Sequence, residues 1–348
     1  MINNIFIAVL LALAVGCNSA QKATDAEVDA TSESMSSMSN NGVPYANTIT
    51  SSELKTHLYK FASDEMQGRM TGSEGQKMAA KYLKDFYVKE NIAAPTDAGY
   101  FQSIPAEYFS RARDPKPSEN VVAFIKGSEK PEEIIVLSAH YDHVGVDKDG
   151  NVFNGADDDG SGTVSMLEMA EAFQKAVEDG NGPKRSILFL HVTGEEIGLY
   201  GSKYYTDNPL FPLANTVANL NTDMIGRIDP DKKDSPNYIY LIGSDKLSQT
   251  LHDVSEEVNN KYINLELDYT YNDENDPNRF YYRSDHYNFA KNNIPIIFYF
   301  NGVHEDYHKI SDTPDKIEYD LMEKRARLIF LTAWEVANRD ERITADKL

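Results

Sequence analysis

Residues 133–177 read EIIVLSAHYDHVGVDKDGNVFNGADDDGSGTVSMLEMAEAFQKAV, which is an apolar run, a polar loop and a helical pattern in succession. The run Glu133–Ser138 is continuous and rich in β-branched residues, as is typical of a strand buried on both faces of a sheet. From Ser161 to Val177, apolar residues such as Val164 and Leu167 recur at the spacing of an amphipathic helix. A buried strand followed by a helix favours an α/β fold.

The same alternation continues on both sides of this segment. Apolar residues recur at helical spacing over Leu54–Phe61 and Met78–Phe86. Four further apolar runs are predicted to be strands, namely Asn120–Ile125, Ser186–His191, Val217–Leu220 and Pro295–Phe300. The pattern predicts one α/β domain over residues 48–348, a single doubly wound, mostly parallel (mixed) sheet flanked by helices. The polar segments Asp229–Asn237 and Tyr271–Asn278 are predicted to be loops.

The N-terminus has the features of an export signal. Residues 5–15 (IFIAVLLALAV) are apolar over a length that suits a signal peptide and is too short to span a membrane. The sequence Ala14-Val15-Gly16-Cys17 then resembles a lipobox, which predicts a lipoprotein-type signal peptide at 1–17 that ends at a lipidated Cys17. Residues 18–47 lack an apolar period and are predicted to be a disordered tether.

These features predict an exported protein in the periplasm or at the outer membrane or cell surface, with a lipid at Cys17 as its only membrane contact. An ordinary signal peptide with an incidental cysteine is the alternative. The 348 residues carry 34 Lys and Arg against 55 Asp and Glu, a formal charge of −21. So acidic a chain is not expected to bind nucleic acid, whose phosphates require a basic face. The oligomeric state stays open.

Side chains that bind metals follow the predicted strands. In chain order they are His140 and Asp142, the triplet Asp157–Asp159, Glu195 and Glu196, Asp223, and Tyr307 with His308. In open α/β sheets, ligands collect at the carboxyl ends of the strands. A lone histidine after a strand is usually structural, and an aspartate triplet before a helix is usually a cap. Because these side chains occur together at strand ends, we predict a metal centre. With Cys17 the only cysteine, its ligands must be histidines and carboxylates.

Several short sequences together resemble a known family. The strings SAHYDH, GADDDGSG, TGEEIGLYGS, NTDMIG and YHKISDTPDKI occur in the order in which the two-zinc aminopeptidases carry similar blocks. That family includes bacterial leucyl aminopeptidase, aminopeptidase S and plasma glutamate carboxypeptidase. SDEMQGRMTGSEG near the start also resembles the family's substrate-side loop, so the resemblance extends from about Ser51 to Asp340.

The resemblance implies five metal ligands and two Zn²⁺ ions per chain, with cobalt or manganese as substitutes that the same ligands accept. His140 and Asp223 would hold one ion, and Glu196 and His308 the other. Asp158, the middle residue of the triplet, would bridge both ions.

Three further roles follow from the resemblance. Glu195 would be the general base, Asp142 would orient the His140 imidazole, and Tyr307 would steady the oxyanion. A structural role is about equally consistent with Tyr307. No role is implied for His143. Three other histidines are expected in the core or at the surface, namely His191, His252 and His286.

The predicted function is that of a zinc-dependent exopeptidase, first of all an aminopeptidase that removes N-terminal residues from peptides. A carboxypeptidase or dipeptidase and a glutaminyl cyclase are alternatives on the same fold. A binding lipoprotein without catalysis is a further alternative, disfavoured because Glu195 and all five ligand positions are filled.

Overall fold

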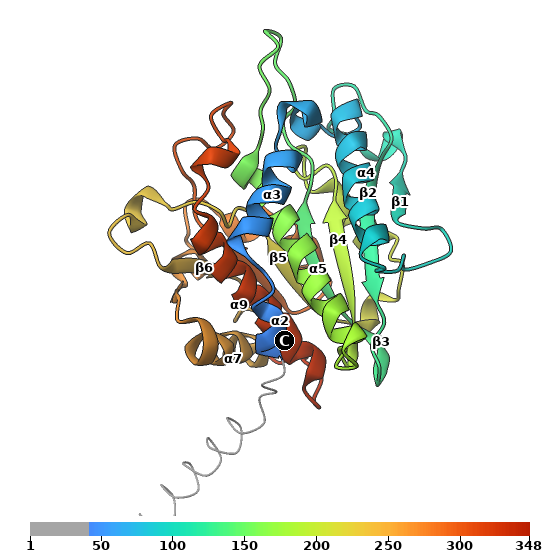
Figure 1. The fold of residues 1–348 in the computed structure, drawn as a ribbon, viewed down its shortest axis with the longest axis vertical. Coiled ribbons are helices and arrows are strands. Elements are labelled where there is room, and N and C mark those ends of the chain that lie inside the picture. The colour runs from blue at the N-terminus through green and yellow to red at the C-terminus, as the bar shows by residue number, and fades with distance from the viewer. Residues whose placement is uncertain (1–41) are drawn as a thin grey trace, which may run out of the picture. The chain divides into compact units, whose positions relative to one another are not determined.

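The computed structural model describes residues 42–348, which belong to one compact unit. Eight strands form one sheet in the order β1-β2-β4-β3-β5-β8-β6-β7 (Figure 1). Their bounds are β1 Phe101–Ile104, β2 Ser118–Ile125, β3 Lys130–His140, β4 Arg185–Val192, β5 Thr216–Thr222, β6 Tyr238–Ile242, β7 Glu266–Asp268 and β8 Ile296–Phe300. Neighbouring strands from β4 to β8 are parallel, whereas β1, β2 and β6 join antiparallel partners. The predicted mixed α/β sheet is therefore confirmed.

Eight helices connect or cover these strands. Their bounds are α2 Val43–Ala46, α3 Ser51–Phe61, α4 Glu74–Lys89, α5 Gly162–Glu178, α6 Tyr200–Asp207, α7 Gln249–Val258, α8 His286–Ala290 and α9 Tyr319–Asn338. Figure 1 shows α3, α5 and α9 lying together across one face of the sheet. Helices α6 and α8 contact each other, and α8 packs against β5 and β8.

Successive residues of the central strands contact helices on opposite faces of the sheet. All residues of β4 and β5 are buried, as their continuous apolar runs predict. Phe189 of β4 packs against Phe173 of α5, with 6.4 Å between the ring centroids. The adjacent Leu190 instead belongs to a cluster with Tyr205 of α6 and Phe289 of α8. Successive side chains of a strand point to opposite faces, so one run of apolar residues supports two helix layers.

Helix α2 lies within residues 18–47, the segment predicted to be a tether. Val43–Ala46 form a helical turn in which Tyr45 and Ala46 are buried. Tyr45 lies against Trp334 of α9, with 5.4 Å between their ring centroids, and this contact holds the turn on the domain. The predicted signal peptide, Cys17 and the rest of the tether lie outside the described residues. None of the helices described at 42–348 is long and apolar enough to cross a bilayer.

Candidate metal centre

The predicted metal ligands meet at the carboxyl ends of four adjacent parallel strands. His140 is the last residue of β3, and Asp223 directly follows β5. Glu196 lies four residues beyond the end of β4, and His308 lies in the loop after β8. The turn Ala156–Ser161 at the start of α5 brings Asp158 to the same place. Since β4, β3, β5 and β8 are neighbours in the sheet, ligands separated in sequence become neighbours in space.

Asp158 occupies the centre of this group. Its Oδ1 lies 3.1 Å from His140 Nε2, and its Oδ2 lies 3.0 Å from His308 Nε2. The two oxygens of one buried carboxylate therefore face two different imidazoles. This is the arrangement required of a carboxylate that bridges two cations.

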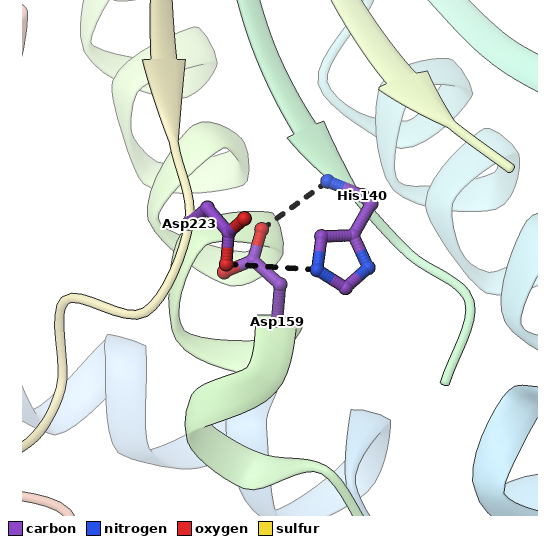
Figure 2. A group of neighbouring side chains, drawn as sticks. All are labelled: His140, Asp159 and Asp223. Carbon is purple, nitrogen blue, oxygen red and sulfur yellow. Dashed lines mark hydrogen bonds and ion pairs between the residues drawn. The ribbon is translucent and has the colours of Figure 1, made fainter. Parts of the chain in front are cut away.

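One further carboxylate lies beside each imidazole. Asp223 Oδ1 is 3.6 Å from His140 Nε2, as Figure 2 shows, and Glu196 Oε2 is 3.1 Å from His308 Nε2. His308 is the most exposed of the five ligands, with 39% of its side chain accessible. The structure thus gathers all five predicted ligands into two groups that share Asp158.

The charges of the group suit divalent cations. Burial alone would lower the pKa of His140, but the carboxylates of Asp223 and Asp158 raise it well above its ordinary value. For His308, hydrogen bonds to Asp158 and Glu196 outweigh burial and raise the pKa to about 10. Carboxylates packed this closely require positive charge between them. Imidazole and carboxylate are also the donors that zinc accepts, so the donor set fits the ions that the resemblance implies.

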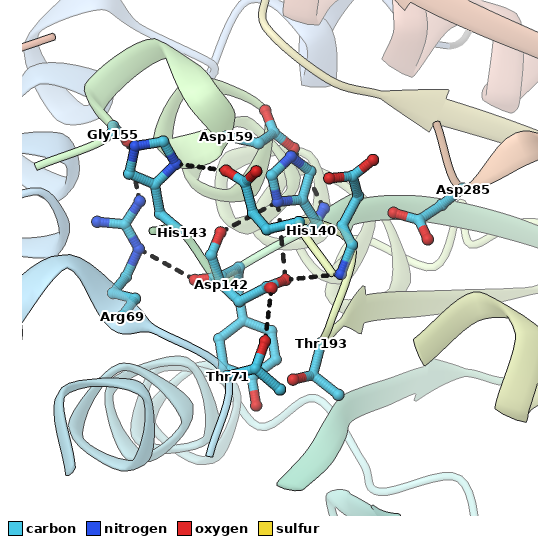
Figure 3. A network of polar contacts seen from close by, with 12 residues as sticks. Arg69, Thr71, His140, Asp142, His143, Gly155, Asp159, Thr193 and Asp285 are labelled. Carbon is cyan, nitrogen blue, oxygen red and sulfur yellow. Dashed lines mark hydrogen bonds and ion pairs between the residues drawn. The ribbon is translucent and has the colours of Figure 1, made fainter. Parts of the chain in front are cut away.

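Asp142 lies beside His140 with both its main chain and its side chain. The His140 Nδ1 atom lies 3.1 Å from the main-chain oxygen of Asp142, whereas the carboxylate Oδ1 is 3.8 Å away. The carboxylate instead accepts hydrogen bonds from the Thr71 hydroxyl at 2.8 Å and from the Glu195 main-chain N–H at 3.2 Å (Figure 3). Asp142 therefore links the His140 loop to the Glu195 turn.

The structure brings in Asp159, which the sequence did not single out from its triplet. Its Oδ1 accepts hydrogen bonds from the main-chain N–H groups of Gly162 and Met224, at 2.9 and 3.1 Å. Its Oδ2 accepts one from the N–H of His140 at 3.2 Å (Figure 2). One buried side chain therefore fixes the ends of β3 and β5 and the start of α5, the three segments that carry His140, Asp223 and Asp158.

His143 also lies at the centre, although the resemblance implies no role for it. Its Nδ1 lies 2.7 Å from Glu196 Oε1 and 3.8 Å from Asp158 Oδ2. The ring is buried and meets His308 edge-on, with 5.8 Å between centroids. Its position three residues after His140 is the only signal in the sequence. By contrast His191 and His286 are buried in the core, as predicted.

A buried arginine holds the two loops of the centre together. Arg69 donates hydrogen bonds to the main-chain oxygens of Tyr141, Asn154 and Gly155 at 2.7–3.0 Å, and to that of Phe61 at 3.2 Å. Figure 3 shows Arg69 beside Gly155. It belongs to SDEMQGRMTGSEG, which resembles the family's substrate-side loop. The arginine instead acts inside the protein, between the segment that follows β3 and the turn before α5.

A cavity opens over the metal centre. Glu195 and Tyr307 line it together with His140, Asp158 and Asp223. Tyr307 stacks on His308 with 3.9 Å between centroids, and burial raises its pKa above the usual range. Burial likewise raises the pKa of Glu195 well above its ordinary value. The rest of the wall is mostly apolar and consists of Met224, Phe280, Arg283, Phe298, Phe300 and Val303.

Comparison with known proteins gives a family. Residues 120–333 match the family described as peptidase family M28. The chain is 35% identical over 133 residues to a probable zinc metalloprotease of Leptosphaeria maculans, an alignment that covers 38% of this chain and 30% of that protein. The chain thus matches about a quarter to a third of the length of the first curated relatives.

Longer similarities are weaker in sequence. The chain is 28% identical over 311 residues to leucine aminopeptidase 1 of Penicillium rubens, covering 85% of this chain and 74% of that protein. The solved structure of LapB from Legionella pneumophila has a TM-score of 0.68 at 22% identity, covering 86% of this chain and 76% of that one. At this identity the structural likeness supports the fold.

Proposed function

Because the chain belongs to peptidase family M28, we propose that it is a zinc-dependent exopeptidase that removes N-terminal residues from peptides. The observation that carries this proposal is the Asp158 carboxylate set between His140 and His308, with Glu195 in the cavity above. Similarity to leucine aminopeptidase 1 of Penicillium rubens supports an aminopeptidase in particular.

The five ligands would hold two Zn²⁺ ions, with Asp158 shared between the pairs His140–Asp223 and His308–Glu196. Zinc at such a site polarises the scissile carbonyl and makes water a stronger nucleophile at neutral pH. The cluster of carboxylates also attracts the protonated α-amine of a peptide, which favours a free N-terminus over a blocked one.

Glu195 would take the proton from the attacking water and return it to the leaving amine. It lines the cavity, and the Asp142 carboxylate accepts a hydrogen bond from its main-chain N–H, which fixes its turn. Its raised pKa moves it toward neutrality, where a general base works best. The phenol of Tyr307, across the same cavity, would donate to the developing oxyanion.

The alternatives differ in measurable ways. A glutaminyl cyclase on this fold needs one zinc, whereas the filled set of five ligands favours two, so metal content per chain separates the two functions. A carboxypeptidase trims the opposite end of a peptide, which a peptide digest read by mass spectrometry reveals. A binding lipoprotein would have no need of Glu195 as a base.

The test is hydrolysis of leucine p-nitroanilide by purified protein, which we expect to stop after complete chelation and to return with zinc. Glu195→Gln should reduce kcat by about 10²–10⁴-fold while it leaves the zinc content unchanged. The substitution retains the shape and removes only the basic oxygen. Activity that persists without metal would refute the mechanism, and full activity of Glu195→Gln would refute the role of the base.

We also propose that the protein is exported and anchored through a lipid on Cys17. The support is the apolar stretch at residues 5–15 and the lipobox-like sequence that ends at Cys17. In cells, Cys17→Ser should move the protein from the membrane fraction to the soluble one. A protein that stays soluble with Cys17 intact would contradict the anchor.

A further inference from the structure

The apolar wall of the cavity contains one cationic side chain. Phe280, Phe298 and Phe300 pack together. The ring centroid of Phe300 lies 5.0 Å from that of Phe280 and 5.3 Å from that of Phe298. Among the described residues that line the cavity, Arg283 is the only lysine or arginine. Arg283 is exposed, so its guanidinium keeps its hydration and is accessible to a ligand that enters the cavity.

Arg283 lies over Phe280, with its guanidinium carbon 4.9 Å from the ring centroid. Its main-chain N–H donates to the Phe280 main-chain oxygen at 3.0 Å, but within residues 42–348 its side chain makes no hydrogen bond and no ion pair, although the chain has an excess of carboxylates. Stacking occupies the face of a guanidinium and leaves the N–H groups at its edge free. Those N–H groups form a fork that matches a carboxylate, and the stacked ring limits how far the fork can turn.

The charges near Arg283 also favour an anion. Four carboxylates line the cavity or face a ligand histidine, namely Asp158, Glu195, Glu196 and Asp223. Two divalent cations would offset these four charges, while Asp142, Asp159 and Asp285 lie behind them. Arg283 is the one cationic side chain among the described residues that line the cavity, and none of these carboxylates forms an ion pair with it.

We propose that Arg283 binds the side-chain carboxylate of an acidic N-terminal residue, so that glutamyl and aspartyl peptides are preferred substrates. This rests on the proposed aminopeptidase function. The methylene groups of a glutamate side chain would lie on Phe298 and Phe300, which an aromatic wall favours, while its carboxylate reaches the guanidinium edge.

The Arg283 guanidinium could equally bind the terminal carboxylate of a dipeptide. The apolar wall favours the N-terminal side chain, because Met224 of that wall directly follows the proposed ligand Asp223 and lines the same cavity. The comparison of Leu-Gly with Leu-Gly amide separates the two sources, since only the first carries a terminal carboxylate.

The test compares the p-nitroanilides of glutamate and glutamine, which differ in charge and hardly in shape. We expect kcat/KM to favour glutamate by about tenfold or more, as for a hydrogen bond to a charged group. Arg283→Gln should bring this ratio close to one, and Arg283→Glu should invert it. Arg279→Gln is the matched control, because Arg279 stacks on Tyr282 at the same distance of 4.9 Å but lines a different cavity.

A binding experiment makes the test independent of turnover. Titration calorimetry of zinc-loaded Glu195→Gln protein should show tighter binding of L-glutamate than of L-glutamine, and the difference should vanish when Arg283→Gln is added. Hydrolysis of leucine p-nitroanilide without a glutamate preference would overturn the assignment of Arg283 and leave the aminopeptidase intact. Glutamate binding without hydrolysis of any anilide would overturn the aminopeptidase and leave Arg283 in place. A loss confined to Leu-Gly would assign Arg283 to the terminal carboxylate and overturn the proposal.

Discussion

Single side chains behind the five ligands determine how well the ligands can hold a cation. Glu196 illustrates this, because its two oxygens face different partners. Oε2 lies 3.1 Å from His308 Nε2, and Oε1 lies 2.7 Å from His143 Nδ1. The close contact with His143 would hold the carboxylate in one rotamer and direct Oε2 toward the second metal position. Partners of this kind strongly influence metal affinity.

His143→Asn should therefore weaken binding of the second zinc by about 10- to 100-fold, with a smaller effect on the first. Asparagine is shorter than histidine and cannot place a donor at the same distance from Glu196. The measurement is a zinc titration against a competing chromophoric chelator, which resolves the two affinities.

His191→Asn is the matched control, since His191 is equally buried but bonds to the Tyr87 hydroxyl at 2.6 Å, away from the ligands. We expect it to leave both zinc affinities unchanged. If His143→Asn still binds two zinc ions with the affinities of the parent protein, other contacts hold Glu196 in place.

The sequence allows some of these residues to be predicted and conceals others. His140 and Asp223 were predictable because each ends a buried strand, where ligands collect. Asp158 and Asp159 are adjacent residues of the same type. Only the path of the backbone places the Asp158 carboxylate beside imidazoles and the Asp159 carboxylate beside main-chain N–H groups. The roles of such residues come from the resemblance or from the structure, since spacing alone does not distinguish them.

At the scale of elements, the turn Asp64–Arg69 clamps two loops that no strand pairing holds. The Arg69 side chain is fully buried and donates to four main-chain oxygens. Each buried oxygen left without a donor costs about 1–3 kcal/mol. Arg69→Leu should therefore lower the free energy of unfolding by at least about 3 kcal/mol, as measured by urea denaturation.

The free energy of unfolding of Arg69→Lys should lie between those of the parent protein and Arg69→Leu, because an ammonium keeps the charge but cannot reach all four oxygens. Arg113→Leu is the control for the loss of an arginine at an exposed position. A change of less than about 1 kcal/mol in Arg69→Leu would mean that water replaces the guanidinium.

Strand β4 carries a histidine whose titration affects stability. Burial lowers the pKa of His191 to about 3, so the folded protein resists a proton that the unfolded chain accepts near its ordinary pKa of 6.5. The unfolded state therefore binds more protons between these values, and stability falls with decreasing pH by about 1.4 kcal/mol per pH unit. Above pH 6.5 neither state is protonated and the effect vanishes.

His191→Gln should remove this contribution. We expect chelator-treated parent protein to lose more stability between pH 7.5 and 5 than the variant does, in urea titrations at both values. The difference between the two proteins isolates His191 from the buried carboxylates, whose raised pKa values act in the opposite direction. Equal losses would show that the histidine is protonated inside the fold.

The same scale shows where strand prediction succeeds. The five runs predicted as strands correspond to β2, β3, β4, β5 and β8, all of which are long enough and apolar enough to be recognised. The edge strands β1 and β7 have four and three residues and incomplete burial, so they leave little apolar pattern. Strand β6 is buried, but it pairs antiparallel to β8 and lies outside the strand–helix alternation that marks the others.

For the whole molecule, the main unfavourable electrostatic contribution comes from the acidic groups that are buried around one site. Burial raises the pKa of Asp142 and Asp312 to about 6 and that of Asp285 to about 7. These groups lie around the ligands in the interior and are not part of the acidic surface. Cations at the centre would offset their repulsion, so metal binding should contribute to folding as well as to catalysis.

We therefore expect zinc to stabilise the entire domain. At a buffered free concentration 100-fold above its Kd, one ion adds about 2.7 kcal/mol, or roughly 4 °C in Tm for a domain of about 300 residues. Asp158→Asn should lose most of the zinc-dependent rise in Tm, because both cations share Asp158, whereas Glu195→Gln should keep it, because Glu195 is not a ligand. Scanning calorimetry with and without zinc distinguishes these results, and an equal rise in both variants would remove Asp158 from the bridging position.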